Sequence, residues 1–170
     1  MRKWNFCAGP AVISEHVLAE VKEELLEWGD SGMSIMEMSH RSSIYDEVAT
    51  TAKQDFIDLL NIPDSHDVLF LQGGATQQFA TVPMNFGHVK KKADYVLSGT
   101  WSKKAISEAS KILEVNTIAS SEDKNFSYAP DPKNWNLSEE SAYVHYCPNE
   151  TIQGVAIHNT PVLEKPLVAD

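Results

Sequence analysis

The 170-residue sequence contains little cysteine and no long apolar run. Its two cysteines, Cys7 and Cys147, lie far apart, and His145 with Cys147 forms only an H-x-C pair, which is too little for a zinc site. We therefore expect free thiols, a reducing cytoplasmic setting and no bound metal. The N-terminal residues lack the apolar segment of a signal peptide, and no stretch approaches the length that crosses a membrane.

Basic residues are also scarce. The chain has 14 lysines and arginines against 24 aspartates and glutamates, which gives a formal net charge of −10. This sign argues against a partner that is nucleic acid or an anionic membrane. Any phosphate bound by this chain must therefore be held by a local site. The length and the hydrophobic content of 42% are typical of a globular domain with a substantial core.

The residue pattern changes along the chain. Residues 1–13 are expected to form an irregular arm, and two amphipathic helices are expected, one from the N-cap Ser14 to Gly29 and one over 44–60. Short apolar runs then alternate with helical patterns. The predicted strands are 67–71, 94–98, 115–119, 142–146, 154–158 and 166–170, and the predicted helices are 76–86 and 101–113. This alternation predicts an α/β fold, with a mostly parallel sheet and helices on both faces.

Four polar fragments lie at the ends of predicted strands. They are "GGAT" (73–76), "SGTW" (98–101), "CPNET" (147–151) and Asp170, which ends the last strand. Ligands of open parallel sheets bind beyond the carboxyl ends of the strands, so we expect the four fragments to form one site.

The first two fragments can contribute a phosphate cradle and a stacking ring. Gly73 and Gly74 allow close backbone approach, and the N–H groups of Ala75 and Thr76 would open a helix toward an anion. The sequence contains neither a Walker loop nor a dinucleotide fingerprint. Trp101 could stack on a flat ring. A packing turn at the glycines and a core tryptophan are the alternatives.

The other fragments can contribute a hydroxyl and a carboxylate. Thr151 could bond a ring oxygen, with Asn149 and Glu150 as alternative polar groups. Asp170 could pair with a protonated ring nitrogen, which would keep the carboxylate ionised. A capped turn and an exposed terminal carboxylate are the structural alternatives. These groups and the phosphate cradle together describe one ligand well, pyridoxal phosphate, whose pyridinium acts as an electron sink.

A loop outside these fragments, "SHRSS", places His40 beside Arg41. An arginine guanidinium forks onto carboxylates and phosphates with two hydrogen bonds. A solvated surface arginine is the alternative.

Six blocks of the sequence resemble the phosphoserine aminotransferases in order and spacing. The blocks are "NFCAGPAVIS", "MEMSHRSSIY", "GGATQQFATVPMN", "SGTWSKKAISEA", "CPNETIQGV" and "VAD". The resemblance implies a fold-type I, class V, pyridoxal-phosphate-dependent transaminase that works as a homodimer. Its substrates would be glutamate and 3-phosphohydroxypyruvate, which give phosphoserine and 2-oxoglutarate in serine biosynthesis. Residues 14–170 would be part of the large cofactor-binding domain, truncated before its C-terminal part and the small domain.

The resemblance also implies roles for individual residues. Those assigned to the cofactor are Gly74, Ala75, Thr76, Trp101, Thr151 and Asp170. The first three would hold its phosphate and Thr151 would bond near its phenolic oxygen. Trp101 would stack on the ring and Asp170 would pair with the ring nitrogen, so these two count as catalytic. The residues assigned to the substrate are His40, Arg41, Ala8 and Gly9.

One family feature does not appear in this chain. In the family the lysine that binds the cofactor covalently lies beyond "VAD", in a Lys-Asn context absent here. Lys165 would lie about 16 Å from Asp170 along a strand, and nothing in the sequence orients Lys103 or Lys104 toward the site. We therefore expect the 170-residue chain alone to lack transaminase activity and to hold any cofactor noncovalently. We also expect it to self-associate through an exposed apolar edge.

Three other interpretations remain open from the sequence. The chain could be a noncatalytic module that binds a phosphorylated small molecule through "GGAT", or an interaction fragment whose exposed sheet surface binds a partner. It could also belong to another fold-type I pyridoxal phosphate enzyme, such as a cysteine desulfurase, with the same cofactor residues.

Overall fold

The computed structural model describes residues 2–170 as two compact units, one ending at Phe70 and one spanning Leu71–Asp170. The boundary between these units lies after Phe70, whereas the sequence predicts a boundary after residue 13, between an N-terminal arm and a large domain. That domain assignment stays a prediction.

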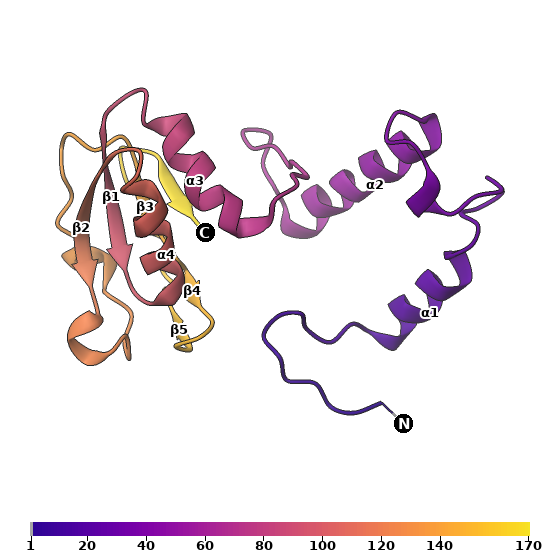
Figure 1. Cartoon of the computed structure of the whole chain (residues 1–170), viewed down its shortest axis with the longest axis horizontal. Helices are drawn as coiled ribbons and strands as arrows, with labels where there is room; N and C mark the ends of the chain where they lie inside the picture. Colours follow the sequence, from indigo (N-terminus) through magenta and orange to yellow (C-terminus); the bar gives the residue numbers. More distant parts are fainter. Residues whose placement is uncertain (1) are drawn as a thin grey trace. The chain divides into compact units, whose positions relative to one another are not determined.

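The first unit consists of two helices and one short 3-10 turn, drawn from indigo to purple in Figure 1. They are α1 (Glu15–Glu24), η1 (Ile35–Glu37) and α2 (Ser43–Leu60). The Ser42 hydroxyl accepts a hydrogen bond from the Tyr45 N–H and so caps the start of α2. Asn61, in the left-handed conformation, ends the helix. Both predicted helices are present, although Ser14 precedes α1 without a side-chain cap bond.

The apolar faces of these helices are exposed in the first unit. Ser34 is the only buried residue among residues 2–70. Large exposed apolar side chains on the two helices include Val17, Val21, Phe56, Leu59 and Leu60, and Leu25, directly after α1, is exposed as well. The apolar residues thus recur at helical spacing, as the sequence predicts. The apolar face that they form on each helix is not buried by other residues of 2–70.

The second unit is built on a four-stranded parallel sheet with the order β2–β1–β3–β6 (Figure 1). Its strands are β1 (Lys92–Leu97), β2 (Glu114–Ser120), β3 (Val144–Tyr146) and β6 (Leu167–Ala169). The helices are α3 (Gly74–Phe86) and α4 (Thr100–Ala109), with the 3-10 turns η2 (Glu122–Lys124) and η3 (Pro132–Asn134) between β2 and β3. The α/β fold with a parallel sheet is thus confirmed.

Alternate residues of β1 enter two separate cores. Tyr95 points into a core that it shares with Phe79 of α3, Ala105 of α4 and Tyr143. Val96 points to the opposite face, whose core consists of Val96, Ile118, Trp135, Val144, Tyr146 and Ile157. Both helices of this unit thus pack on one face, while the other face is covered by residues outside the helices. The central strand β1 is accordingly buried on both faces, with residues 93–96 all buried, as is typical of a parallel sheet.

Two predicted strands differ from the structure. The segment 67–71 is not a strand, and Leu69, Phe70 and Leu71 are each more than half exposed. A strand needs a neighbour for its backbone hydrogen bonds, and none of the described strands pairs with this segment. The segment 154–158 contributes only β5 (Val155–Ala156), which forms an antiparallel hairpin with β4 (Asn149–Glu150) and is not part of the main sheet.

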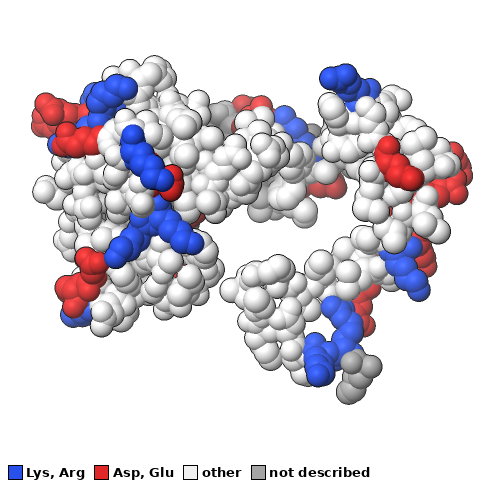
Figure 2. Space-filling view, viewed as in Figure 1, with Lys and Arg blue, Asp and Glu red and all other residues white. Residues whose placement is uncertain are grey.

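Charged side chains of both signs are interspersed over the visible face of each unit (Figure 2). Ion pairs in the second unit include Lys92 with Glu114 at 3.2 Å and Lys103 with Glu122 at 3.6 Å. No helix within residues 2–170 combines the length and the apolar character needed to cross a membrane.

Candidate functional site

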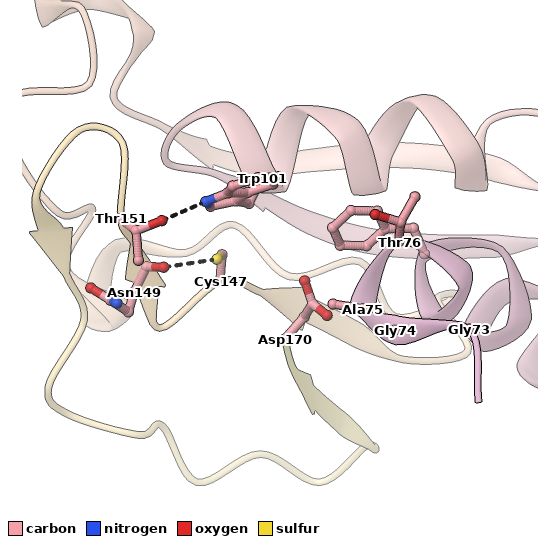
Figure 3. A pocket seen from close by; sticks show the side chains of 10 residues that line it. Gly73, Gly74, Ala75, Thr76, Trp101, Cys147, Asn149, Thr151 and Asp170 are labelled. Carbon is pink, nitrogen blue, oxygen red and sulfur yellow. Dashed lines mark hydrogen bonds between the residues drawn. The ribbon is translucent and has the colours of Figure 1, made fainter. Parts of the chain in front are cut away.

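A pocket of about 330 Å³ opens at the carboxyl end of the parallel sheet (Figure 3). Its lining residues are Gly73, Gly74, Ala75, Thr76, Phe79, Trp101, Cys147, Asn149, Thr151 and Asp170. The structure therefore brings all four predicted fragments to one place. Three of them follow β1, β3 and β6, and the fourth is supplied by the N-terminus of α3 rather than by the end of a strand.

Two consecutive glycines shape the α3 side of the pocket. Gly73 and Gly74 have φ angles of 103° and 62°, a region that L-residues rarely adopt. A Cβ atom on Gly73 would also lie 1.8 Å from Oε1 of Gln77. The backbone N–H groups of the first helical turn, which includes Ala75 and Thr76, have no partner inside the helix. The anion-binding role expected of "GGAT" stays a prediction, and these N–H groups are the ones that would carry it.

Trp101 and Thr151 are hydrogen-bonded to each other at one wall of the pocket. The indole Nε1–H of Trp101 donates a hydrogen bond of 2.8 Å to Oγ1 of Thr151 (Figure 3). On the indole ring, the Lys104 ammonium lies 4.6 Å from the centroid, within the range of a cation–π contact. Trp101 is half-buried: it packs against the core that contains Phe79, and its ring also borders the pocket, with its edge hydrogen-bonded to the hydroxyl.

Glu150 is the residue that the sequence reasoning undervalued. Its side chain is fully buried, and it accepts hydrogen bonds from the backbone N–H groups of Trp101 at 2.8 Å and Ser102 at 2.9 Å. The carboxylate thus caps the start of α4, where a negative charge is favoured. Gly99 permits this approach, because a Cβ there would lie 2.6 Å from Cδ of Glu150. No signal in the sequence near Glu150 shows this role, because its partners lie 49 and 48 residues away.

Asp170 presents a carboxylate to the pocket (Figure 3). Burial, and then the nearby charge of Glu150, raise the pKa of this carboxyl above its ordinary value. A cation placed against it would act in the opposite direction and favour the ionised form. The pKa of the Cys147 thiol rises to about 12, mainly by burial, so this pocket-lining thiol stays protonated near neutral pH.

Three buried side chains form a polar aromatic cluster near the pocket. The rings of His145 and Tyr95 stack with centroids 4.7 Å apart, and the hydroxyls of Tyr95 and Tyr143 lie 2.6 Å apart. Nδ1 of His145 has no hydrogen-bond partner. Burial therefore lowers the pKa of His145 to about 4, so its imidazole is neutral at pH 7.

The residues predicted to bind substrate lie in the first unit. Ala8, Gly9, His40 and Arg41 are all exposed there, whereas the pocket is lined entirely by the second unit. Their roles stay predictions, as do the cofactor roles of the pocket residues.

Of the lysines considered for the site, Lys104 lies against the Trp101 ring, while Lys103 pairs with Glu122. Lys165 donates hydrogen bonds to the carbonyl of Ser138 and to the hydroxyl of Ser141, and no lysine is among the described residues that line the pocket. Nor do residues 2–170 contain a cluster of three or more side chains that could hold a metal ion.

Known proteins of similar sequence match nearly the whole chain. The family model for class-V aminotransferases matches residues 3–166. A curated phosphoserine aminotransferase from Hahella chejuensis is 51% identical over 170 residues, which cover 99% of this chain and 47% of the relative. The chain thus spans about half the length of the curated relatives it matches.

Solved structures agree with this result. Phosphoserine aminotransferase from Bacillus circulans subsp. alkalophilus superposes with a TM-score of 0.95 at 40% identity, over 99% of this chain and 47% of that one. The pyridoxal-phosphate-bound enzyme from Trichomonas vaginalis gives a TM-score of 0.92 at 38% identity, over 99% of this chain and 50% of that one. The resemblance inferred from six sequence blocks is confirmed, and the chain belongs to the class-V aminotransferase family.

Proposed function

We propose that this chain contributes the cofactor site of a phosphoserine aminotransferase. The complete enzyme would transfer the amino group of glutamate to 3-phosphohydroxypyruvate, in the cytoplasm and as a homodimer. The observation that carries the proposal is the meeting of a glycine-lined helix start, an indole, a hydroxyl and a carboxylate in one pocket.

The lining residues fit pyridoxal phosphate. Gly74, at which a Cβ would meet nothing within 4 Å, leaves room for an anion at the start of α3, where a phosphate would be held by backbone N–H groups. The indole of Trp101 offers a flat surface for an aromatic ring. Asp170 is the only acidic residue among the described lining residues, and burial, followed by the charge of Glu150, raises the pKa of its carboxyl. A ring that carries a protonated nitrogen would give this carboxylate a cationic partner.

When bound, pyridoxal phosphate supplies the electron sink for amino transfer. The residues of this chain would bind it and orient it. Asp170 would keep a proton on the ring nitrogen, because an ionised carboxylate favours the charged form of a neighbouring base. Trp101 would fix the plane of the ring, and Thr151, which already binds the indole edge, would hold the adjacent side of the site.

The 170-residue chain alone would bind the cofactor without turning over substrate. None of the described residues that line the pocket is a lysine, so the pocket offers no amine for covalent attachment. This makes noncovalent binding of a phosphorylated pyridine the activity expected of the chain by itself. Turnover of phosphoserine by the purified chain, or a borohydride-stable adduct at one of its lysines, would contradict this expectation.

Titration of the chain with pyridoxal phosphate tests the proposal. We expect a saturable change in cofactor absorbance, with affinity reduced at least tenfold for Trp101→Ala and for pyridoxal, which lacks the phosphate. Gln153→Ala is the matched control, because Gln153 lies close to the site but does not line the pocket. Equal binding of pyridoxal and pyridoxal phosphate, or unchanged binding by Trp101→Ala, would contradict the proposed site.

A further inference from the structure

We propose that Glu150 is a positioning residue, which works with Thr151 to hold Trp101 at two points and so fixes the plane of the indole beside the pocket. This inference rests on the proposed function in one respect: the plane of the indole matters because a cofactor ring would stack on it. The contacts themselves are independent of any ligand.

The first contact point is the backbone of Trp101. Its N–H donates to Oε2 of Glu150 at 2.8 Å, while the N–H of Ser102 donates to Oε1 at 2.9 Å. The two oxygens of one carboxylate therefore bind two successive N–H groups in the first turn of α4. This arrangement determines where α4 begins, and with it the Cα position of the tryptophan.

The second contact point is the far edge of the indole. Nε1 donates to the hydroxyl of Thr151, the residue that follows Glu150. Two adjacent residues of one segment thus bind the backbone and the ring edge of one tryptophan. A rotation of the ring about its side-chain torsions must break the second contact, and a shift of the helix start must break the first.

The segment that supplies both groups is itself held in place. Glu150 lies in β4 and pairs with Val155 of β5 in the antiparallel hairpin. Its carboxylate is fully buried and also lies 3.5 Å from the hydroxyl of Ser98. A buried carboxylate is costly unless it is hydrogen-bonded, and these partners satisfy it. A Ser, Thr, Asp or Asn side chain is enough to cap a helix. A fully buried glutamate is not needed for capping alone, which indicates that Glu150 also has a positioning role.

Another residue at the same helix start provides a comparison. Gln153 accepts a hydrogen bond from the Thr100 N–H at 3.2 Å and donates one of 2.7 Å to the Thr100 hydroxyl. It therefore caps α4 without binding the tryptophan. If Glu150 acted only as a helix cap, loss of either residue would have the same effect on the indole.

The test follows the indole N–H of Trp101 by NMR in the cofactor-free chain. The resonance is assigned with Trp101→Phe, and its hydrogen exchange is measured in Glu150→Gln, Glu150→Asp and Gln153→Ala. Glutamine keeps the shape but has one acceptor oxygen, and aspartate keeps the charge but is one methylene shorter. We expect exchange about tenfold faster in both Glu150 variants, as for loss of one hydrogen bond, and unchanged exchange in Gln153→Ala.

A second variant covers the case in which the Glu150 variants do not fold. Gly99→Ala keeps the Glu150 side chain but displaces its carboxylate, because the new Cβ would lie 2.6 Å from Cδ of Glu150 and 2.7 Å from Oε1 of Gln153, in extended backbone that any residue adopts. It should also speed exchange at the indole. Wild-type exchange in a folded Glu150→Gln, or in Gly99→Ala, would overturn the inference. If the wild-type chain fails to bind pyridoxal phosphate, the proposed function fails, but the exchange result still decides the role of Glu150.

Discussion

The indole Nε1–H of Trp101 lies 2.8 Å from the hydroxyl oxygen of Thr151, a residue 50 positions later in the chain. The two residues follow different strands of one parallel sheet, β1 and β3, whose carboxyl ends lie side by side. Their contact converts two separate sequence motifs into one wall of a pocket.

Replacement of this hydroxyl tests its contribution to cofactor binding. Thr151→Val keeps the shape of the side chain and removes the acceptor for the indole. We expect the affinity for pyridoxal phosphate to fall about fivefold, which corresponds to about 1 kcal/mol for one hydrogen bond. Thr151→Ser is the matched control, because it keeps the hydroxyl, and its affinity should stay close to that of the wild type. Equal titration curves for the valine and serine variants would contradict the expectation.

The glycine at the start of α3 can be tested in the same way. Gly73→Ala should destabilise the chain by about 1–3 kcal/mol in urea unfolding, because φ is 103° and the new Cβ would meet Oε1 of Gln77. The double variant Gly73→Ala/Gln77→Ala removes the contacts with Oε1 and Cδ, leaves the Cβ of residue 77 at 3.0 Å and keeps the backbone strain. It should recover only part of the lost stability. Complete recovery would show that the positive φ costs nothing.

The buried histidine predicts a pH dependence of stability. The pKa of His145 is lowered from 6.5 to about 4 in the folded chain, so the unfolded chain binds more protons between these values. Its contribution to stability is therefore present above pH 6.5 and is lost as the pH falls toward 4. We expect a loss of roughly 3 kcal/mol from this residue, measured by urea unfolding at several pH values.

The matched variant for this measurement is His145→Gln, which is neutral throughout the range. Its free energy of unfolding should depend less steeply on pH between 6.5 and 4 than that of the wild type. Parallel curves for the two chains would show that His145 is not the group responsible.

The sequence predicted the site better than it predicted the strands. The meeting of Trp101, Thr151 and Asp170 follows from a general property of parallel sheets and needs only that each strand end be placed to within a residue or two. The segment 67–71 was assigned wrongly, because an apolar run does not reveal whether a neighbouring strand is available to pair with it. The start of α3 nevertheless reaches the pocket, since the helix rather than a strand positions its glycines.

The role of Glu150 could not be derived from its neighbours in the sequence. Its partners, Trp101 and Ser102, lie 49 and 48 residues away, and they are brought to the carboxylate only by the packing of α4 against the hairpin. The sequence shows a polar turn, "CPNET", in which three residues could have carried the function. Burial distinguishes them: Glu150 is fully buried, whereas Asn149 and Thr151 are exposed.

The ring nitrogen of the cofactor gives the most direct test of the proposed site. Pyridoxal phosphate labelled with ¹⁵N at that nitrogen should show the chemical shift of a protonated pyridine when bound to the wild-type chain near pH 7.5. In Asp170→Asn, which keeps the shape but removes the charge, the shift should move toward that of the neutral ring. The same nitrogen shift in both bound complexes would contradict the pairing of Asp170 with the ring, and with it the orientation of the cofactor in this pocket.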